Sequence, residues 1–243
     1  MHSRSSAEPA PAVQAVLFDL DGTLLDTVAD ISCALDRALA EQLSSTLPQS
    51  EVRKLIGRGV ATLIERAVAL LPGAEAVDRG RLLERFHFHY EQILRGGEMQ
   101  TRAYPGVAHG LAELHSLGLK VAVVTNKPAA VSAALLARLG LGQWIDALVG
   151  GDDGYRKPQP QPLLTTCARL GVPPARAVMV GDSMTDVLAA RAAGLRIVCV
   201  PYGYNEGVDP RTLPCDAFVE SIGELPALLA AAGCALAPAA HRE

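Results

Sequence analysis

The sequence lacks an excess of basic residues, and it has no apolar run as long as a membrane span. Its 22 Lys and Arg residues are outnumbered by 26 Asp and Glu residues, which gives a formal net charge of -4. Proteins that bind nucleic acid normally carry a basic patch or stripe, and a transmembrane helix needs about 18 consecutive apolar residues. We therefore expect neither a nucleic acid nor a membrane among the partners of this chain.

Closely spaced cysteines are also missing. The five cysteines form no CxxC pair and are scattered over the chain: Cys33, Cys167, Cys199, Cys215 and Cys234. Scattered free thiols are typical of a reducing compartment, so a cytoplasmic location is predicted. The first residues contain no apolar centre of about 7–15 residues, which a signal peptide would need. We expect residues 1–13 to form a disordered tail and the Ala-rich residues 234–243 to be frayed.

Short apolar runs punctuate the chain and predict buried strands. They cover residues 15–18, 121–124, 147–149, 177–180 and 197–200. Because these runs are continuous rather than alternating, we expect both faces of the sheet to be covered. Helical patterns separate the later runs, and this alternation favours parallel strands with right-handed crossovers. The predicted fold is α/β, a doubly wound parallel sheet of the Rossmann-like kind.

Residues 28–103 interrupt the alternation and have a helical pattern throughout. Val60, Leu63, Ile64, Ala67, Val68 and Leu71 form a wide apolar stripe at helical spacing. Two further apolar patterns, before and after this one, indicate a three-helix insertion. We therefore predict a core domain of residues 14–27 and 104–233 and an inserted, all-helical domain of residues 28–103.

Polar residues follow the predicted strands at the point where each strand ends. The first strand is followed by Asp19 and Asp21, the second by Thr125 and Asn126, the third by a loop leading to Lys157, and the fourth by Asp182 and Asp186. The carboxyl ends of parallel strands form one ligand-binding edge, so these side chains should converge. Crowded carboxylates repel one another unless a cation lies between them. Ligands that are all oxygen favour a hard divalent ion, and Mg²⁺ is the predicted cofactor.

The spacing of Asp19 and Asp21 suits a reaction at phosphorus. Residues two apart in an extended segment point to the same side. One carboxylate can attack phosphorus and form an aspartyl phosphate, while the other protonates the departing alkoxide and then activates a water molecule. With Mg²⁺ and Lys157 nearby, the site would accept a dianion such as a phosphate ester, which is the predicted small-molecule partner.

Four segments together resemble the motifs of the haloacid dehalogenase superfamily. They are FDLDGTLLDT from Phe18, VVTNK around Thr125, RKPQPQP with Lys157, and GDSMTD with Asp182, and they occur in the order of the family. The helical insertion after the first motif is similar to the helical cap of these enzymes.

The resemblance implies a role for each of these residues. Asp19 would be the nucleophile and Asp21 the acid and base. Thr125 and Lys157 would hold the phosphoryl group, and Asn126 is expected to bind the substrate as well. Mg²⁺ would be bound by Asp19, by the backbone carbonyl of Asp21 and by Asp182, with Asp186 acting on the metal indirectly or through water.

Finer details resemble one subfamily, the bacterial phosphoglycolate phosphatases. They are TNKP at residues 125–128, KPQPQPL at 157–163, VPYGYNEG at 200–207 and LIGRGVATLIERA at 55–67. The implied reaction is the hydrolysis of 2-phosphoglycolate to glycolate and phosphate. In the insertion, Arg58 would reach the substrate carboxylate, because its guanidinium can bind a carboxylate bidentately. Lys127 is expected only to support the loop or the rim of the site.

Other functions remain open on the sequence alone. A related phosphatase for another sugar phosphate shares TNKP and the helical insertion, and a phosphomutase shares the four motifs. A phosphonatase would need a Schiff-base lysine from the insertion, where Lys54 is the only one. A silent binding module on the same fold would be expected to have lost Asp19, Asp21 or Asp182, and none is lost. The oligomeric state cannot be inferred from the sequence pattern.

Overall fold

The computed structural model describes residues 13–43 and 45–231. The two predicted tails, apart from Val13, and Cys234 lie outside the described residues. The main sheet has six strands in the order β5-β4-β1-β6-β7-β8, and every neighbouring pair in it is parallel. The strands are β1 (Ala15–Phe18), β4 (Lys120–Val124), β5 (Ala147–Val149), β6 (Ala177–Gly181), β7 (Arg196–Cys199) and β8 (Ala217–Phe218). The predicted α/β fold with a parallel sheet is confirmed.

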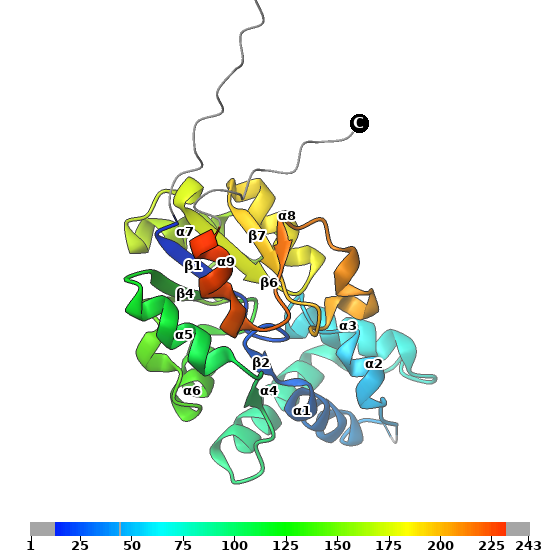
Figure 1. Ribbon diagram of the computed structural model, residues 1–243. Coiled ribbons are helices and arrows are strands. Elements are labelled where there is room, and N and C mark those ends of the chain that lie inside the picture. The colour runs from blue at the N-terminus through cyan, green and yellow to red at the C-terminus, as the bar shows by residue number, and fades with distance from the viewer. Residues whose placement is uncertain (1–12, 44, 232–243) are drawn as a thin grey trace, which may run out of the picture.

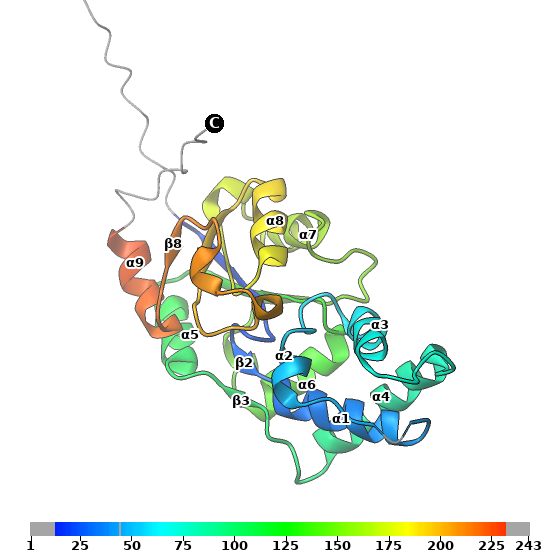
Figure 2. The same ribbon diagram turned by 90° about the vertical axis from the view of Figure 1, so that its right-hand side faces the viewer.

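Helices cover both faces of this sheet, as its continuous apolar strands require. On β1, Val16 and Phe18 pack into a hydrophobic cluster with α5 (Val107–Ser116), α6 (Ala129–Arg138) and α9 (Leu225–Ala231). Ala15 and Leu17 pack into the opposite cluster with α7 (Gln161–Leu170) and α8 (Met184–Ala193). Figure 2 shows α5 and α9 on one side of the sheet and α7 and α8 on the other.

Four helices form an insertion between β1 and the rest of the sheet. They are α1 (Val28–Ala40), α2 (Gln49–Arg53), α3 (Val60–Leu70) and α4 (Arg79–Arg95). Their buried side chains form a hydrophobic cluster of their own, and Figure 1 shows the four helices together below the ends of the sheet strands. The helix α2 was not predicted, because it has five residues and buries only Val52. The exact division into a core and an inserted domain stays a prediction.

The insertion is tied to the core at both of its ends. The chain enters through β2 (Leu25–Asp26) and returns through β3 (Arg102–Ala103), and these two strands pair antiparallel. Asp30, which is fully buried in α1, accepts hydrogen bonds from the backbone N–H groups of Gln100 at 2.9 Å and Thr101 at 2.8 Å. The carboxylate of Asp30 therefore holds α1, where the insertion begins, to the segment before β3, where the insertion ends.

The loop after β7, residues 200–207, connects the core to the insertion. The hydroxyl of Tyr204 accepts a hydrogen bond from the backbone N–H of Thr27 at 2.8 Å, just before α1 begins. Arg53 of α2 donates to the carbonyls of residues 202 and 203 at 2.7 and 2.9 Å, and its guanidinium lies 4.6 Å from the centre of the Tyr204 ring. Residues 202–204 of this loop therefore contact the insertion directly.

Short 3₁₀ helices complete the described chain. They are η1 (Gly142–Trp144), η2 (Pro174–Arg176), η3 (Asn205–Gly207), η4 (Pro210–Thr212) and η5 (Ile222–Glu224). Among the helices in residues 13–43 and 45–231, none has the length and apolar content to cross a membrane.

Candidate active site

The carboxyl ends of two adjacent strands, β1 and β6, bring the predicted acidic residues together. Asp19 follows β1 directly, and its N–H donates to the carbonyl of Val180 on β6 at 2.9 Å. Asp182 follows β6, and Asp186 lies in the first turn of α8. One carboxylate oxygen from each of Asp19, Asp182 and Asp186 lies within 4.8 Å of the other two, and all three residues are buried.

Asp186 is the hydrogen-bonding centre of this cluster. Its Oδ1 accepts from the Nζ of Lys157 at 2.7 Å. Its Oδ2 accepts from the N–H and Oγ of Ser183 at 3.1 and 2.7 Å and from the N–H of Asp182 at 3.3 Å. A carboxylate suits this place, because the first turn of a helix presents unpaired N–H groups. With both of its oxygens engaged, Asp186 is placed to hold Lys157 and the turn before α8.

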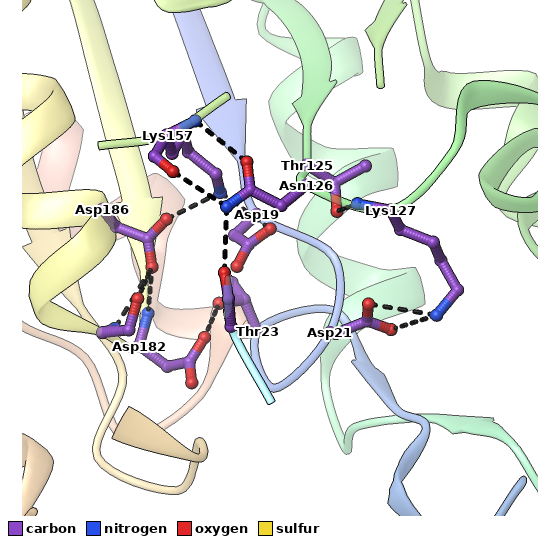
Figure 3. A network of polar contacts seen from close by, with 11 residues as sticks. Asp19, Asp21, Thr23, Thr125, Asn126, Lys127, Lys157, Asp182 and Asp186 are labelled. Atoms are coloured by element: carbon purple, nitrogen blue, oxygen red, sulfur yellow. Dashed lines mark hydrogen bonds and ion pairs between the residues drawn. The ribbon is translucent and has the colours of Figure 1, made fainter. Parts of the chain in front are cut away.

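Lys157 joins the nucleophile candidate to this centre. Its Nζ lies 2.8 Å from Oδ1 of Asp19, and its side chain is only 1% exposed. Burial alone would lower the pKa of Lys157, but the carboxylates of Asp186 and Asp19 outweigh it and raise the pKa above its usual value. The lysine is therefore a fixed cation between Asp19 and Asp186, as Figure 3 shows.

Asn126 organises the loops that carry these groups. Its Oδ1 accepts from the N–H of Lys157 at 2.9 Å, and its Nδ2 donates to the carbonyls of Lys157 at 3.0 Å and Gly57 at 2.9 Å. The amide thus links the loop after β4, the loop before α7 and the insertion. Since an amide has one oxygen and two N–H donors, these three contacts place Asn126 as a scaffold. Its predicted binding of substrate stays a prediction.

Two glycines form a tight cradle around Asp182. Its Oδ1 accepts from the hydroxyl of Thr23 at 2.8 Å, and its Oδ2 accepts from the N–H of Tyr204 at 2.7 Å. A Cβ on Gly22, whose φ is +89°, would lie 2.5 Å from Oδ2 of Asp182, and one on Gly203 would lie 2.1 Å from its Cβ. Both positions therefore require glycine for the carboxylate to keep its orientation.

Gly203→Ala is expected to destabilise the protein by about 1–3 kcal/mol, because the added methyl group overpacks a buried carboxylate. A denaturant titration measures the change in the free energy of unfolding. Gly97→Ala is the matched control, since a Cβ there meets nothing within 4 Å. Equal stability of the two variants would contradict the proposed cradle.

The charges of the cluster call for a cation of two positive charges. When all three carboxylates are ionised, they face one ammonium group, and two negative charges remain uncompensated. Burial raises the pKa of Asp19 to about 8 against the opposing effect of Lys157, and burial with the neighbouring Asp186 raises the pKa of Asp182 to about 6. The donors are all oxygen, as hard divalent cations prefer. The residues at this site therefore fit a divalent metal ion.

Asp21 lies apart from the acidic cluster, as Figure 3 makes clear. Its Oδ1 and Oδ2 accept from the Nζ of Lys127 at 3.0 and 3.1 Å, and its Oδ1 also accepts from the hydroxyl of Thr27 at 2.7 Å. Lys127 is buried, and its N–H donates to the hydroxyl of Thr125 at 3.1 Å. This ion pair, whose side chains are 7% exposed at Lys127 and 14% exposed at Asp21, holds Asp21 in one orientation.

A partly open cavity lies between the core side of the site, at Asp19, and the helical insertion. Asp19, Asp21, Thr125 and Lys127 border it from the core side. Apolar side chains of the insertion form much of the opposite wall. The two predicted catalytic carboxylates therefore border the same space, which can hold a small substrate.

Arg58 forms an ion pair with Glu206 in the structure. Its Nε is 2.6 Å from Oε1 of Glu206, whose Oε2 is 2.8 Å from Arg66. The side chain of Arg58 is 52% exposed, and the cavity is lined by Gly57 and Gly59 but not by Arg58. The predicted contact with the substrate stays a prediction, and the structure gives Arg58 a different partner.

Lys127 has closer contacts with the site than its sequence pattern indicates. The sequence predicts that Lys127 supports the loop or the rim of the site; in the structure it is 8% exposed, borders the cavity and pairs with Asp21. The signal that could have found it is its position: Lys127 comes two residues after Thr125, at the end of a strand whose edge carries the site. Tyr90 of α4, which also borders the cavity, had no such signal in the sequence.

Most of the chain is similar to proteins of one family. The model of the haloacid dehalogenase-like hydrolases matches residues 16–200, and the chain belongs to this family. It is a hydrolase of the phosphatase type.

Two relatives with similar sequences are both named phosphoglycolate phosphatase. A phosphoglycolate phosphatase of Cupriavidus necator is 45% identical over 93% of this chain and 96% of its own length. One of Nitrosospira multiformis is 42% identical over 91% and 97%.

Solved structures agree with this result. A crystal structure described as a predicted phosphoglycolate phosphatase, from Haemophilus somnus, is similar with a TM-score of 0.81 and 28% identity. The similar region covers 89% of this chain and 97% of the chain in that crystal structure. CbbY of Rhodobacter sphaeroides in complex with phosphate has a TM-score of 0.74 and 26% identity, with coverages of 88% and 96%.

Proposed function

We propose that this protein hydrolyses 2-phosphoglycolate to glycolate and phosphate, with Mg²⁺ as cofactor and an aspartyl phosphate as intermediate. The observation that carries the proposal is the place of Asp19, which borders the cavity while its Oδ1 lies 2.8 Å from the Nζ of Lys157. The names of the similar proteins support the choice of substrate.

The first step is attack by Asp19. One of its carboxylate oxygens forms a bond to phosphorus, and the bond between phosphorus and the ester oxygen breaks. Lys157 and the hydroxyl of Thr125 hold the phosphoryl oxygens, so the reacting atoms are aligned before the step begins. Asn126 and Asp186 act through Lys157, whose backbone and ammonium group they bind.

Asp21 transfers the protons. Its carboxyl group protonates the departing alkoxide, which leaves as glycolate, and the resulting carboxylate then takes a proton from the water molecule that cleaves the aspartyl phosphate. The position of Asp21 at the cavity supports this role. Its hydrogen bonds to Lys127 and Thr27 fix its orientation in the absence of substrate.

Asp19, Asp182 and the backbone carbonyl of Asp21 are the proposed ligands of Mg²⁺. When bound, this ion neutralises the negative charge that the carboxylates and the phosphoryl group bring together. The two uncompensated charges of the acidic cluster support a divalent ion, and the oxygen donors support Mg²⁺ in particular.

Phosphate release from a panel of esters tests the proposal. The panel contains 2-phosphoglycolate, several sugar phosphates, a nucleotide and pyrophosphate, each with Mg²⁺ and with EDTA. We expect release to depend on Mg²⁺ and kcat/KM to be highest for 2-phosphoglycolate. A higher kcat/KM for a sugar phosphate would keep the mechanism and reject the substrate. Undiminished release in EDTA would reject the metal.

A further inference from the structure

The charges around the cavity are distributed unevenly. Among the described residues that line it, Lys127 carries the one fixed positive charge. Lys157 is not among the residues that line the cavity, and its ammonium group, which contacts Asp19 and Asp186, is assigned by the proposed function to the phosphoryl group and not to the leaving group. His87 also borders the cavity, but burial lowers its pKa, so its ring is neutral at neutral pH.

The wall formed by the insertion offers little to an anion. Ile31, Ile56, Val60 and Leu63 contribute apolar surface to it. Such a wall packs well against a methylene group, but a carboxylate placed against it without a cation or donor would lose its hydration at a large cost. A substrate with a carboxylate therefore needs its counter-charge on the core side of the cavity.

Lys127 has the capacity to supply that charge. An ammonium group has three N–H donors, and its contacts with Asp21 go to the two oxygens of a single carboxylate, at 3.0 and 3.1 Å. The ring of Tyr90 lies 4.9 Å from the Nζ of Lys127, and Phe86 stacks on that ring at a centroid distance of 5.7 Å. An aromatic face beside a cation restricts where the cation lies without neutralising it.

The covalent structure of the proposed substrate agrees with this position. In 2-phosphoglycolate one methylene group separates the ester oxygen from the carboxyl carbon. The cation that recognises the carboxylate must therefore lie close to the group that protonates the ester oxygen. Lys127 contacts Asp21 directly, whereas Arg58 is paired with Glu206 outside the cavity lining.

We propose that Lys127 is the residue that determines specificity for a carboxylate on the leaving group, with Tyr90 positioning its ammonium group. The proposal rests on the proposed function and assigns the substrate carboxylate to Lys127 instead of Arg58. The proposal has a second consequence. A substrate carboxylate that binds the ammonium group of Lys127 competes with Asp21 for that group, so a substrate that fits loosens the ion pair that holds Asp21 in place.

The test compares two esters that differ only in the carboxylate. They are 2-phosphoglycolate and 2-hydroxyethyl phosphate, and the quantity measured is the ratio of their kcat/KM values with Mg²⁺. We expect Lys127→Met to lower this ratio by about 10- to 100-fold, the value of one charge-assisted hydrogen bond. Lys127→Gln removes the charge but keeps a donor for Asp21, so it tests the charge even if Lys127→Met folds poorly.

Arg58→Ala is the matched variant, because it removes the other cation that could bind the carboxylate. We expect it to leave the ratio of kcat/KM values unchanged. A second readout is the binding of both esters to an Asp19→Asn protein by calorimetry. Adding Lys127→Gln to this protein should weaken the binding of 2-phosphoglycolate only.

Each outcome decides the proposal. If the wild-type protein prefers 2-phosphoglycolate and Lys127→Gln keeps that preference, the role of Lys127 is overturned and the proposed function stands. A ratio lowered by Arg58→Ala instead would give the carboxylate to Arg58. If the wild-type protein shows no preference between the two esters, both the role of Lys127 and the proposed substrate are overturned, and only the phosphatase class remains.

Discussion

Replacing Asp19 with asparagine is expected to lower kcat for phosphate release by at least about 10⁴-fold, because an amide oxygen is too weak a nucleophile to attack phosphorus. Asp19 borders the cavity, and no second carboxylate of the described residues shares both that border and the contact with Lys157. Stopped reactions followed by intact-protein mass measurement should reveal a phosphoryl adduct on the wild-type protein and none on Asp19→Asn.

The amide itself should be tolerated in the fold. Burial raises the pKa of Asp19 to about 8, which means that the ionised carboxylate is disfavoured at neutral pH. A neutral amide of the same shape avoids this cost of burying a charge. Asp209→Asn is the matched control, since Asp209 is an exposed residue that caps η4 and asparagine caps as well as aspartate. If Asp19→Asn kept more than about a hundredth of the wild-type kcat, Asp19 would not be the nucleophile.

Removing divalent metal is expected to make the stability of the protein fall as the pH rises. The folded-state pKa values of Asp19 and Asp182 are raised from 3.8 to about 8 and about 6. Between the unfolded and folded values, the folded state binds more protons than the unfolded state, so the free energy of unfolding decreases with increasing pH. The loss is complete once the pH has passed the folded pKa of Asp19, at about 8.

Mg²⁺ should reverse this trend, because it binds the ionised carboxylates of the folded state and stabilises that state by mass action. Thermal unfolding between pH about 6.5 and about 8.5, with EDTA or with Mg²⁺, measures the effect. This window avoids His87, whose lowered pKa makes stability rise with pH below its ordinary value of 6.5. Asp19→Asn should flatten the slope in EDTA, and a thermal midpoint indifferent to Mg²⁺ at pH about 8 would contradict a metal site at these carboxylates.

Much of the fold could be predicted, because its strands are buried on both faces and their sequences are continuously apolar. Residues 15–18 and 147–149 were predicted as strands and form β1 and β5 with the same bounds. The strand β8 was missed because its two residues, Ala217 and Phe218, form no run. The pairing of β2 with β3 was missed for the same reason.

The sequence by itself determined the acidic cluster. Asp19 and Asp182 follow strands that are neighbours and parallel, so local patterns and one rule about strand ends were enough to bring them to one edge. Asp186 joins them because it lies within one helical turn of Asp182. Chemistry that depends on short segments at a sheet edge is visible in the sequence.

Only the tertiary structure decided how the insertion meets this edge. The ion pairs of Lys127 with Asp21 and of Arg58 with Glu206 join residues 106 and 148 positions apart, and no periodicity relates such residues. The contact of Arg58 with Glu206 depends in addition on how the separately packed hydrophobic cluster of the insertion lies against that of the core. Burial then sets the strength of each charge, because the same lysine is weakly bound in water and firmly paired where water is excluded.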